Sequence, residues 1–587
     1  MPQIETAGAH HRETTPEGIF IEWDVPIEMD DGLRLRADVY RPTGEGPFPV
    51  LLTYGPYGKG LPFQEGYKTS WDIMARNHPD VTAGSTNRFQ NWEVVDPEKW
   101  VPQGYVVIRV DSRGAGRSPG RMDLWSPRET RDFYECIEWA GTQPWSNGKV
   151  GLNGISYYAM NQWQVAATQP PHLAAMCVWE GSSDWYRDVS HHGGLLSVFI
   201  SNWIPMQVRS VQYGRGENGP RDPNSGLLVC GDETLSDEQR AANLVDLGAQ
   251  FVEHPLEDGL YGDRTPDFEK ITVPLLSAGN WGGQGLHLRG NIEGYLRAAS
   301  PQKWLEMHGL EHWTEFYTDY GRGLQLRFFD HFLKGEDNGW AEQPPLQLNI
   351  RHPGERFLPR PEQSWPLERT EWTRYYLDAD GGTLVTRAPS SAGAVAYDTT
   401  GDGASFSVGP LTEGTEITGP IAAKLFVESS TADADLFLVV RVFSPDGEEV
   451  VFHGALDPHT PVAQGWLRAS HRKLDEKLSQ PHRPFHTHDE VQPLTPGEVY
   501  ELDVEIWPTC LAIPAGYRIQ LDVRGKDYVY PGPAAHLSNM KYPMTGCGPF
   551  LHDNPQDRPA ELFEGTVTVH TGGDRQSYLL LPLIPPA

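Results

Sequence analysis

The stretch Lys149-Val-Gly-Leu-Asn-Gly-Ile-Ser156-Tyr157-Tyr-Ala-Met decides the fold, because it predicts a strand, a tight turn at a serine and then a helix. The apolar run before the turn is typical of a buried strand, and the segment after Ser156 has a helical pattern to about Gln169. Such a turn holds the serine in strained backbone angles at the sheet edge, with a helix N-terminus beneath it. The helix dipole favours negative charge beside Ser156, although Tyr158 stands where this motif usually ends in glycine.

A second strand and a glycine-rich loop precede this stretch. Tyr105–Asp111 is an apolar strand, Arg113–Gly120 is the loop, and a helix near Glu129–Gly141 carries apolar residues at i, i+3, i+4 and i+7. A strand–helix–strand unit of this length predicts a parallel pair of strands joined by a right-handed crossover. The loop could instead bind a dinucleotide, but the G-x-G-x-x-G pattern of such sites is absent.

Length, charge and cysteine content exclude several classes of protein. A chain of 587 residues should hold two or three domains. Its net charge of −31 argues against nucleic acid or an anionic membrane as a partner. No apolar run is long enough to span a bilayer, and Met1–Thr6 lacks the features of a secretory signal. Five scattered cysteines without a C-x-x-C pair indicate a reduced protein, so we expect a cytoplasmic location.

The sequence divides into an α/β part with an insertion and an all-β part. Strands and helices alternate in residues 1–183 and again in 270–342, which predicts one α/β core. Helical patches and Gly/Pro/Asp-rich loops in residues 184–269 predict an inserted helical cap. From residue 343 to 587, short strands separated by turns predict an all-β sandwich, with its clearest strands at Ala422–Glu428, Leu436–Phe443, Val499–Ile506 and Arg518–Val523.

Several motifs along the chain carry a family resemblance. They are Asp31–Pro42, Pro56-Tyr57-Gly58-Lys59, Asp111-x-Arg113-Gly114-x-Gly116, Gln143–Gly151, the serine turn, Thr418-Gly419-Pro420 and Pro514-Ala515-Gly516. In this combination the chain resembles the serine hydrolases that group cocaine esterase, α-amino acid ester hydrolases and Xaa-Pro dipeptidyl-peptidases. The resemblance covers nearly the whole length. It implies an α/β-hydrolase core, a helical cap inserted in that core and a C-terminal jelly-roll sandwich.

The resemblance also implies catalytic roles. Ser156 is the expected nucleophile, and the backbone N–H of Tyr157 with the phenol of Tyr57 is the expected oxyanion hole. Two donors aimed at a developing alkoxide are what acyl transfer needs. The general base should follow the last strand of the core sheet. Alignment of that loop favours His312, with two lesser candidates, His308 and His287.

The triad acid is where the sequence departs from the family pattern. Relatives place an aspartate soon after a core strand, but here the segment reads Gly279-Asn280-Trp281-Gly282-Gly283-Gln284 and has no carboxylate. The strand Leu173–Trp179 should lie next to the nucleophile strand, and it ends directly in Glu180. Because a triad is defined by geometry, we expect Glu180 to orient His312, with Asp184 as the runner-up. A degraded triad, with Glu180 an ordinary loop carboxylate, is the alternative.

The substrate is less visible in the sequence. Trp281 and Trp313 flank the predicted base and, with Trp185 of the cap, are expected to line an apolar pocket, although such aromatics also pack cores. Three cap carboxylates could hold a substrate ammonium or simply be solvated: Glu253, Glu257 and Asp258.

The function expected is a serine esterase that cleaves small-molecule carboxylic esters through an acyl-enzyme. No cofactor and no metal is expected. Xaa-Pro dipeptidyl-peptidase activity and amino-acid ester or amide hydrolysis are alternatives from the same class. A catalytically degraded binding module is the alternative from another class. The partner expected is a small-molecule ester or amide, and a homo-oligomer is left open.

Overall fold

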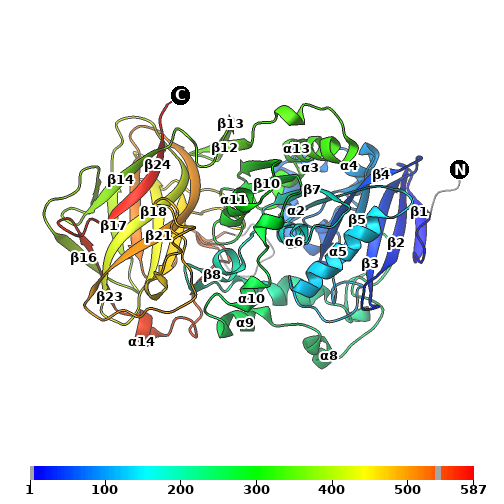
Figure 1. Ribbon diagram of the computed structural model, residues 1–587, viewed down its shortest axis with the longest axis horizontal. Helices are drawn as coiled ribbons and strands as arrows, with labels where there is room; N and C mark the ends of the chain where they lie inside the picture. The colour runs from blue at the N-terminus through cyan, green and yellow to red at the C-terminus, as the bar shows by residue number, and fades with distance from the viewer. Residues whose placement is uncertain (1–4, 536–543, 587) are drawn as a thin grey trace.

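The computed structural model describes residues 5–535 and 544–586, which form two large sheets at opposite ends of the molecule (Figure 1). The first sheet has the strand order β1-β2-β3-β5-β4-β6-β7-β10-β11-β12-β13. Its strands are β1 (His11–Thr14), β2 (Ile19–Glu28), β3 (Arg34–Pro42), β4 (Phe48–Gly55), β5 (Val106–Asp111), β6 (Ser146–Ile155), β7 (Leu173–Trp179), β10 (Leu275–Asn280), β11 (Lys303–His308), β12 (Leu346–His352) and β13 (Arg356–Glu362).

The strands from β5 to β12 run parallel, and helices cover both faces of this part of the sheet (Figure 1). Every residue of β5 is buried, as expected for a strand that is covered on both faces. The sequence predicted β5 and β6 as a parallel pair. They are parallel, but β4 lies between them. The prediction that β7 lies next to the nucleophile strand β6 is confirmed.

The helices of this part follow the sequence pattern closely. They are α1 (Phe63–Gly66), α2 (Lys68–Asn77), α3 (Pro79–Thr82), α4 (Pro97–Trp100), α5 (Pro127–Gly141), α6 (Tyr157–Ala166), α11 (Leu288–Arg297), α12 (Thr314–Tyr317) and α13 (Asp319–Phe329). The Ser126 side chain caps α5 by accepting a hydrogen bond from the Glu129 N–H. A last π turn, η7 (Asp330–Lys334), ends at Gly335, whose left-handed φ of 75° is accessible to glycine at little cost.

The segment predicted to be an inserted cap consists of short helices, turns and one short hairpin. Its elements are η2 (Trp185–Ser190), the hairpin β8 (His191–His192) and β9 (Leu195–Leu196), α7 (Phe199–Trp203), η3 (Ile204–Val208), η4 (Arg209–Val211), η5 (Gly216–Asn218), α8 (Asp237–Ala242), α9 (Leu247–Glu253), α10 (Gly259–Gly262) and η6 (Phe268–Lys270). Among the described residues, none of the helices has both the length and the apolar character that crossing a membrane requires.

The second sheet is an all-β unit that closes on itself, because β18 pairs with β24 as well as with β21 and β23. Its strands are β14 (Glu371–Asp378), β15 (Thr383–Val385), β16 (Gly393–Asp398), β17 (Ala404–Val408), β18 (Thr415–Ser429), β19 (Asp435–Phe443), β20 (Ala463–Arg468), β21 (Val499–Ile513), β22 (Arg518–Arg524), β23 (Thr566–Thr571) and β24 (Tyr578–Ile584). The remaining short elements are η1 (Val101–Gln103), η8 (Trp340–Glu342), η9 (Ala469–His471) and α14 (Ala560–Phe563). Buried Val, Leu and Ile side chains fill the interior.

The boundary between the two sheets differs from the sequence division. The sequence placed all residues from 343 in the sandwich, but β12 pairs with β11 and β13 pairs with β12 in the first sheet. Both strands are short, and sequence alone does not assign them to one sheet or the other. The second sheet begins at β14. A shared apolar cluster that includes Trp281, Phe437 and Trp507 joins the two parts.

Candidate active site

Ser156 lies at the turn between β6 and α6, as the sequence predicts. Its backbone angles are φ 57° and ψ −112°, outside the regions that a non-glycine residue normally occupies. The Ser156 N–H donates to the carbonyl oxygens of Trp179 and Glu180 at 3.2 and 3.1 Å, which ties the turn to the end of β7. A Cβ on Gly154 would lie 2.5 Å from the Cβ of Tyr158, so this position has no room for a side chain. The geometry is that of a nucleophile elbow.

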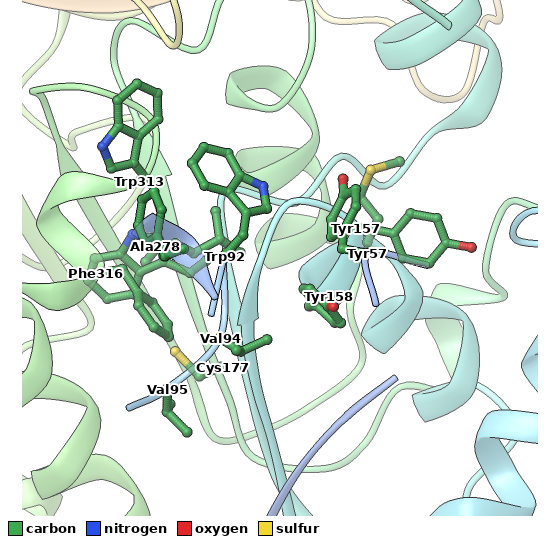
Figure 2. Close-up of a cluster of buried hydrophobic side chains, with 14 of the residues drawn as sticks. Tyr57, Trp92, Val94, Val95, Tyr157, Tyr158, Cys177, Ala278, Trp313 and Phe316 are labelled. Atoms are coloured by element: carbon green, nitrogen blue, oxygen red, sulfur yellow. The ribbon is translucent and has the colours of Figure 1, made fainter. Parts of the chain in front are cut away.

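Two hydrogen-bond donors border the Ser156 hydroxyl. Tyr157 is the first residue of α6, and the N–H groups of a first turn have no acceptor within the helix. Tyr57 lines the same cavity as Ser156, and Figure 2 shows it grouped with Tyr157 and Tyr158. Burial raises the pKa of Tyr57 well above its usual value, so its phenol remains a donor. The Tyr157 side chain points elsewhere and donates to Glu129 at 2.5 Å.

The histidine nearest to the serine is His287, and this differs from the sequence prediction. The Nε2 atom of His287 lies 3.1 Å from Ser156 Oγ. His312, the predicted base, lines the same cavity, and its ring stacks on His287 with the centroids 5.3 Å apart. Its own nitrogens bind two carboxylates. His308 is turned away from the cavity and binds Glu306 through Nδ1 at 2.6 Å.

Glu180 leaves the end of β7 and reaches His312, the predicted base. One carboxylate oxygen lies 2.6 Å from His312 Nδ1, and the other lies 3.1 Å from His308 Nε2. Burial alone would raise the pKa of Glu180, but the two histidines lower it to about 2, so the group is ionised. The runner-up Asp184 instead caps η2 and pairs with Arg187 at 2.9 Å.

An aromatic cavity of about 40 Å³ surrounds Ser156. Its walls come from the core, the cap and the second sheet, and they are Tyr57, Trp92, Glu93, Ser156, Phe199, Trp203, Gln207, Leu286, His287, His312, Ala455, Leu456 and Phe550. The space as it stands admits only a small group, so a larger substrate requires movement of these walls.

The three tryptophans expected in the pocket lie elsewhere. Trp281 is fully buried and donates from its indole N–H to the Asn349 carbonyl at 2.9 Å. Trp313 packs behind Trp92, and Figure 2 shows Trp92 between it and the tyrosines. Trp185 packs on Trp125 with ring centroids 4.5 Å apart. All three are core residues, because each of their rings is enclosed by protein on every side.

The cap carboxylates do not face Ser156 either. Glu257 binds Arg187 at 2.5 Å, and Asp258 binds His254 at 2.6 Å while capping α10. Glu253 is the last residue of α9. Glu257 in its ion pair and Asp258 in its hydrogen bond to His254 belong to the packing of the cap.

The chain is similar to known hydrolases over its whole length. Residues 31–314 match the family described as X-Pro dipeptidyl-peptidase (S15 family), and residues 338–580 match the X-Pro dipeptidyl-peptidase C-terminal non-catalytic domain. The solved structure of a CocE/NonD family hydrolase from Staphylococcus aureus is 32% identical, with a TM-score of 0.82 over 96% of this chain and 94% of that chain. This chain belongs to the CocE/NonD hydrolase family.

Two further relatives of this protein are less similar in sequence. Cocaine esterase from Rhodococcus sp. is 25% identical, and the alignment covers 96% of this chain and 98% of that protein. A solved α-amino acid ester hydrolase is 17% identical, with a TM-score of 0.67 over 98% of both chains. At this identity the likeness shows a shared fold alone. The family and the Ser156 elbow together make this protein a serine hydrolase.

The structure gives a physical reason for the missing aspartate of this CocE/NonD hydrolase. Gly282 lies in the segment where the family resemblance leads us to expect the acid, and a Cβ there would lie 2.2 Å from the His453 carbonyl oxygen. The Ala455 N–H also donates to the Gly282 carbonyl at 3.0 Å. A loop of the second sheet therefore fills the space that an aspartate side chain needs. Glu180 directly follows the neighbouring strand, β7.

Glu93 is the site residue that sequence reasoning missed. Its carboxylate lies 2.9 Å from His312 Nε2, so His312 is held between two carboxylates. Burial raises the pKa of Glu93 to about 7. Burial opposes the charge on His312, but Glu180 and Glu93 raise the pKa of that ring to about 10. Glu93 follows Asn91-Trp92 in a loop without a motif, and its left-handed φ of 63° is not readable from sequence.

Proposed function

We propose that this serine hydrolase cleaves carboxylic esters of small molecules through an acyl-enzyme on Ser156. The observation that carries the proposal is Ser156 at a strained elbow, facing an aromatic cavity that also holds two histidines and Tyr57. The name of the Rhodococcus relative, cocaine esterase, supports an ester as the substrate. A strained, fully assembled site of this kind also argues for an enzyme rather than a degraded binding module.

A second candidate is hydrolysis of an amino-acid ester or amide, including an Xaa-Pro dipeptide amide. The observation that favours it is Glu93, whose buried carboxylate lines the cavity together with Ser156. A carboxylate among aromatic rings suits a substrate ammonium. Both family descriptions matched by this chain also name X-Pro dipeptidyl-peptidases.

In the proposed mechanism His312 is the general base and Glu180 orients it. The Nε2 proton of His312 passes to Glu93, which leaves a neutral ring whose Nδ1–H still donates to Glu180. Ser156 Oγ then bonds to the ester carbonyl carbon while its proton moves to His312 Nε2. The carbonyl oxygen gains the negative charge, faced by Tyr57 and the Tyr157 N–H. His312 returns the proton to the departing alkoxide, and water repeats the sequence on the acyl-enzyme.

Removing the Tyr57 hydroxyl should slow turnover without disturbing the fold. We expect Tyr57→Phe to lower kcat about 10²- to 10³-fold, because one donor to the oxyanion is lost. KM should change little, since the donor acts on charge that develops in the transition state. The matched control is Tyr67→Phe. The centroid of the Tyr67 ring lies 6.4 Å from that of Tyr57, and Tyr67 is not among the cavity walls. Equal losses in the two variants would contradict the oxyanion role.

Neutralising Glu93 should shift the pH profile. We expect Glu93→Gln to move the acid limb of kcat/KM to lower pH, because the pKa of His312 falls when one of its two carboxylate partners is removed. The base is then neutral over a wider range. The measurement is kcat/KM against pH for both proteins with one substrate. A limb that stays in place, or moves to higher pH, would show that Glu93 does not control the base.

The function itself is tested with a fluorophosphonate probe and a substrate panel. The panel contains a short-chain p-nitrophenyl ester, an amino-acid ester and an Xaa-Pro p-nitroanilide, each with wild type and Ser156→Ala. We expect the probe to label wild type alone and the p-nitrophenyl ester to be the best substrate. Faster hydrolysis of the Xaa-Pro amide would favour the second candidate. Neither labelling nor turnover would favour the binding module.

The cellular setting is part of the same proposal. We place the protein in the cytoplasm, because all five cysteines are free and buried, which suits a reducing compartment. Its net charge of −31 keeps it from nucleic acid and anionic membranes, and a small-molecule ester or amide is the partner proposed.

A further inference from the structure

The contacts of His287 decide which of its ring nitrogens carries the proton. The backbone N–H of Ser182 donates to His287 Nδ1 at 3.1 Å. A backbone N–H can only donate, so Nδ1 must present its lone pair there. In a neutral imidazole the hydrogen is then on Nε2, the atom 3.1 Å from Ser156 Oγ. A nitrogen that already carries a hydrogen cannot accept the serine proton.

The surroundings keep His287 neutral. Burial lowers the pKa of His287 well below its usual value, and the charge on the stacked His312 ring lowers it further, while Glu180 opposes this. The fixed tautomer therefore persists at neutral pH.

We propose that His287 is a catalytic hydrogen-bond donor to Ser156 Oγ, and that the proton of the serine goes to His312. The inference rests on the proposed function, since it assigns one of the two histidines of that same site. His287 donates while Ser156 Oγ loses its proton and again when Oγ leaves the acyl group in deacylation. These are the two moments at which that oxygen carries most negative charge. No proton is transferred to or from His287, so the balance of the reaction is unchanged.

One loop, residues 180–183, binds the Nδ1 atoms of both His287 and His312 and so fixes their tautomers. Glu180 binds His312 Nδ1, and two residues later the Ser182 N–H binds His287 Nδ1. The loop is fixed to the start of α11 by three more hydrogen bonds: Gly181 N–H to Asn291 Oδ1 at 2.9 Å, Ser182 Oγ to the Leu286 carbonyl at 2.5 Å and Ser183 Oγ to the Gly290 carbonyl at 2.9 Å. The same loop thus leaves Nε2 of His312 free to accept the serine proton once His312 is neutral, and makes Nε2 of His287 a donor.

The close contact at Gly290 keeps this arrangement in place. A Cβ on Gly290 would lie 2.5 Å from Ser182 Cα and 2.5 Å from the Ser183 nitrogen. The loop and the helix therefore approach backbone to backbone, which holds the Ser182 N–H at its hydrogen-bond distance from the ring.

The test compares three variants with one ester substrate. We expect His287→Ala to lower kcat about 10²-fold, as for the loss of one preorganised donor. His287→Gln keeps an N–H and should recover about tenfold over alanine. Both should keep the acid limb of the wild-type pH profile, because the base is intact. His312→Ala should abolish the reaction. If His287→Ala and His287→Gln fall equally to the level of Ser156→Ala, His287 is the base and the proposal is overturned.

Ser182→Ala is the matched control for the tautomer. It removes the hydroxyl, 3.0 Å from His287 Nδ1, but keeps the backbone N–H. If Nδ1 accepts from the N–H, turnover falls by no more than about tenfold, because the base is intact and only the hydrogen bond from the Ser182 hydroxyl to the Leu286 carbonyl is lost. If instead Nδ1 carries the hydrogen and donates to the hydroxyl, this variant loses activity as a base variant does, which would overturn the proposal.

A measurement independent of activity separates this proposal from the proposed function. In protein labelled with ¹⁵N-histidine, NMR reports which ring nitrogen is protonated, and the His287→Gln spectrum identifies the His287 signals. We expect a proton on Nε2 and none on Nδ1 at neutral pH. A proton on Nδ1 would overturn the donor role even if ester hydrolysis is confirmed. Absence of ester hydrolysis with the expected tautomer would reject the function but leave the assignment of the proton.

Discussion

Glu180→Gln lowers kcat about 10⁴-fold, if Glu180 orients the base as proposed. The glutamine side chain is nearly isosteric, but its amide can donate a hydrogen bond to His312 Nδ1. In the wild-type structure that contact is 2.6 Å, and the nitrogen donates because the carboxylate can only accept. The exchange would favour the tautomer with the hydrogen on Nε2, which cannot accept the serine proton. The measurement is kcat for the best ester substrate, with thermal unfolding to confirm that the variant is folded.

The control for this effect is Glu306→Gln. Glu306 is as deeply buried as Glu180 and binds His308 Nδ1 at 2.6 Å, but His308 is turned away from the serine. We expect turnover within about tenfold of wild type, since only a neighbouring hydrogen bond is altered. Near-normal activity of Glu180→Gln would show that another group orients His312. Equal losses in both variants would mean that the buried charge network as a whole, rather than Glu180, is what matters.

The second large effect concerns the place where relatives carry their acid. Gly282→Asp restores the aspartate of the family pattern, yet we expect it to lower the free energy of unfolding by about 3 kcal/mol and not to support activity. The Cβ would lie 2.2 Å from the His453 carbonyl oxygen and 2.6 Å from Gly454 Cα. Both are backbone atoms of the second sheet's loop, so the loop as a whole must move. Thermal and urea unfolding measure the loss.

The control is Gly323→Ala, on helix α13, where a Cβ would meet nothing within 4 Å. This variant should be neutral or more stable by up to about 1 kcal/mol, because alanine favours a helix. The double variant Glu180→Gln/Gly282→Asp provides the sharper test. If it regains activity that Glu180→Gln lacks, the loop admits an acid at position 282 and the steric argument is wrong.

The parts of the fold that the sequence predicts are those with local signals. The serine elbow follows from a strand, a glycine and a helix within twelve residues, and the α5 stripe follows from its spacing. The position of Glu180 follows from β7 being next to β6, which the order of elements suggests. The membership of β12 in the first sheet depends on a pairing with β11 that no local pattern encodes.

The site itself is less predictable, because its contacts join segments far apart in the chain. Glu93 and His312 are separated by 219 positions, and the role of His287 depends on a backbone N–H that any residue except proline would supply at position 182. For the tryptophans, the sequence predicted a place in the pocket that the structure does not show. Trp281 stands next to the predicted loop in sequence, but its side chain enters a core shared with the second sheet. Proximity along the chain does not fix the direction of a side chain.

The contribution of the second sheet to the cavity has a consequence for synthesis of the protein. Every residue proposed to act on the ester is in the chain once position 312 has been made. The wall formed by Ala455, Leu456 and Phe550 comes later. The Ala455 carbonyl also accepts the His312 N–H at 3.1 Å, so the loop of the base gains its support from the same late segment. We therefore expect a growing chain on the ribosome to hold the nucleophile without its finished pocket, and esterase activity to begin only when the last domain has folded against the first.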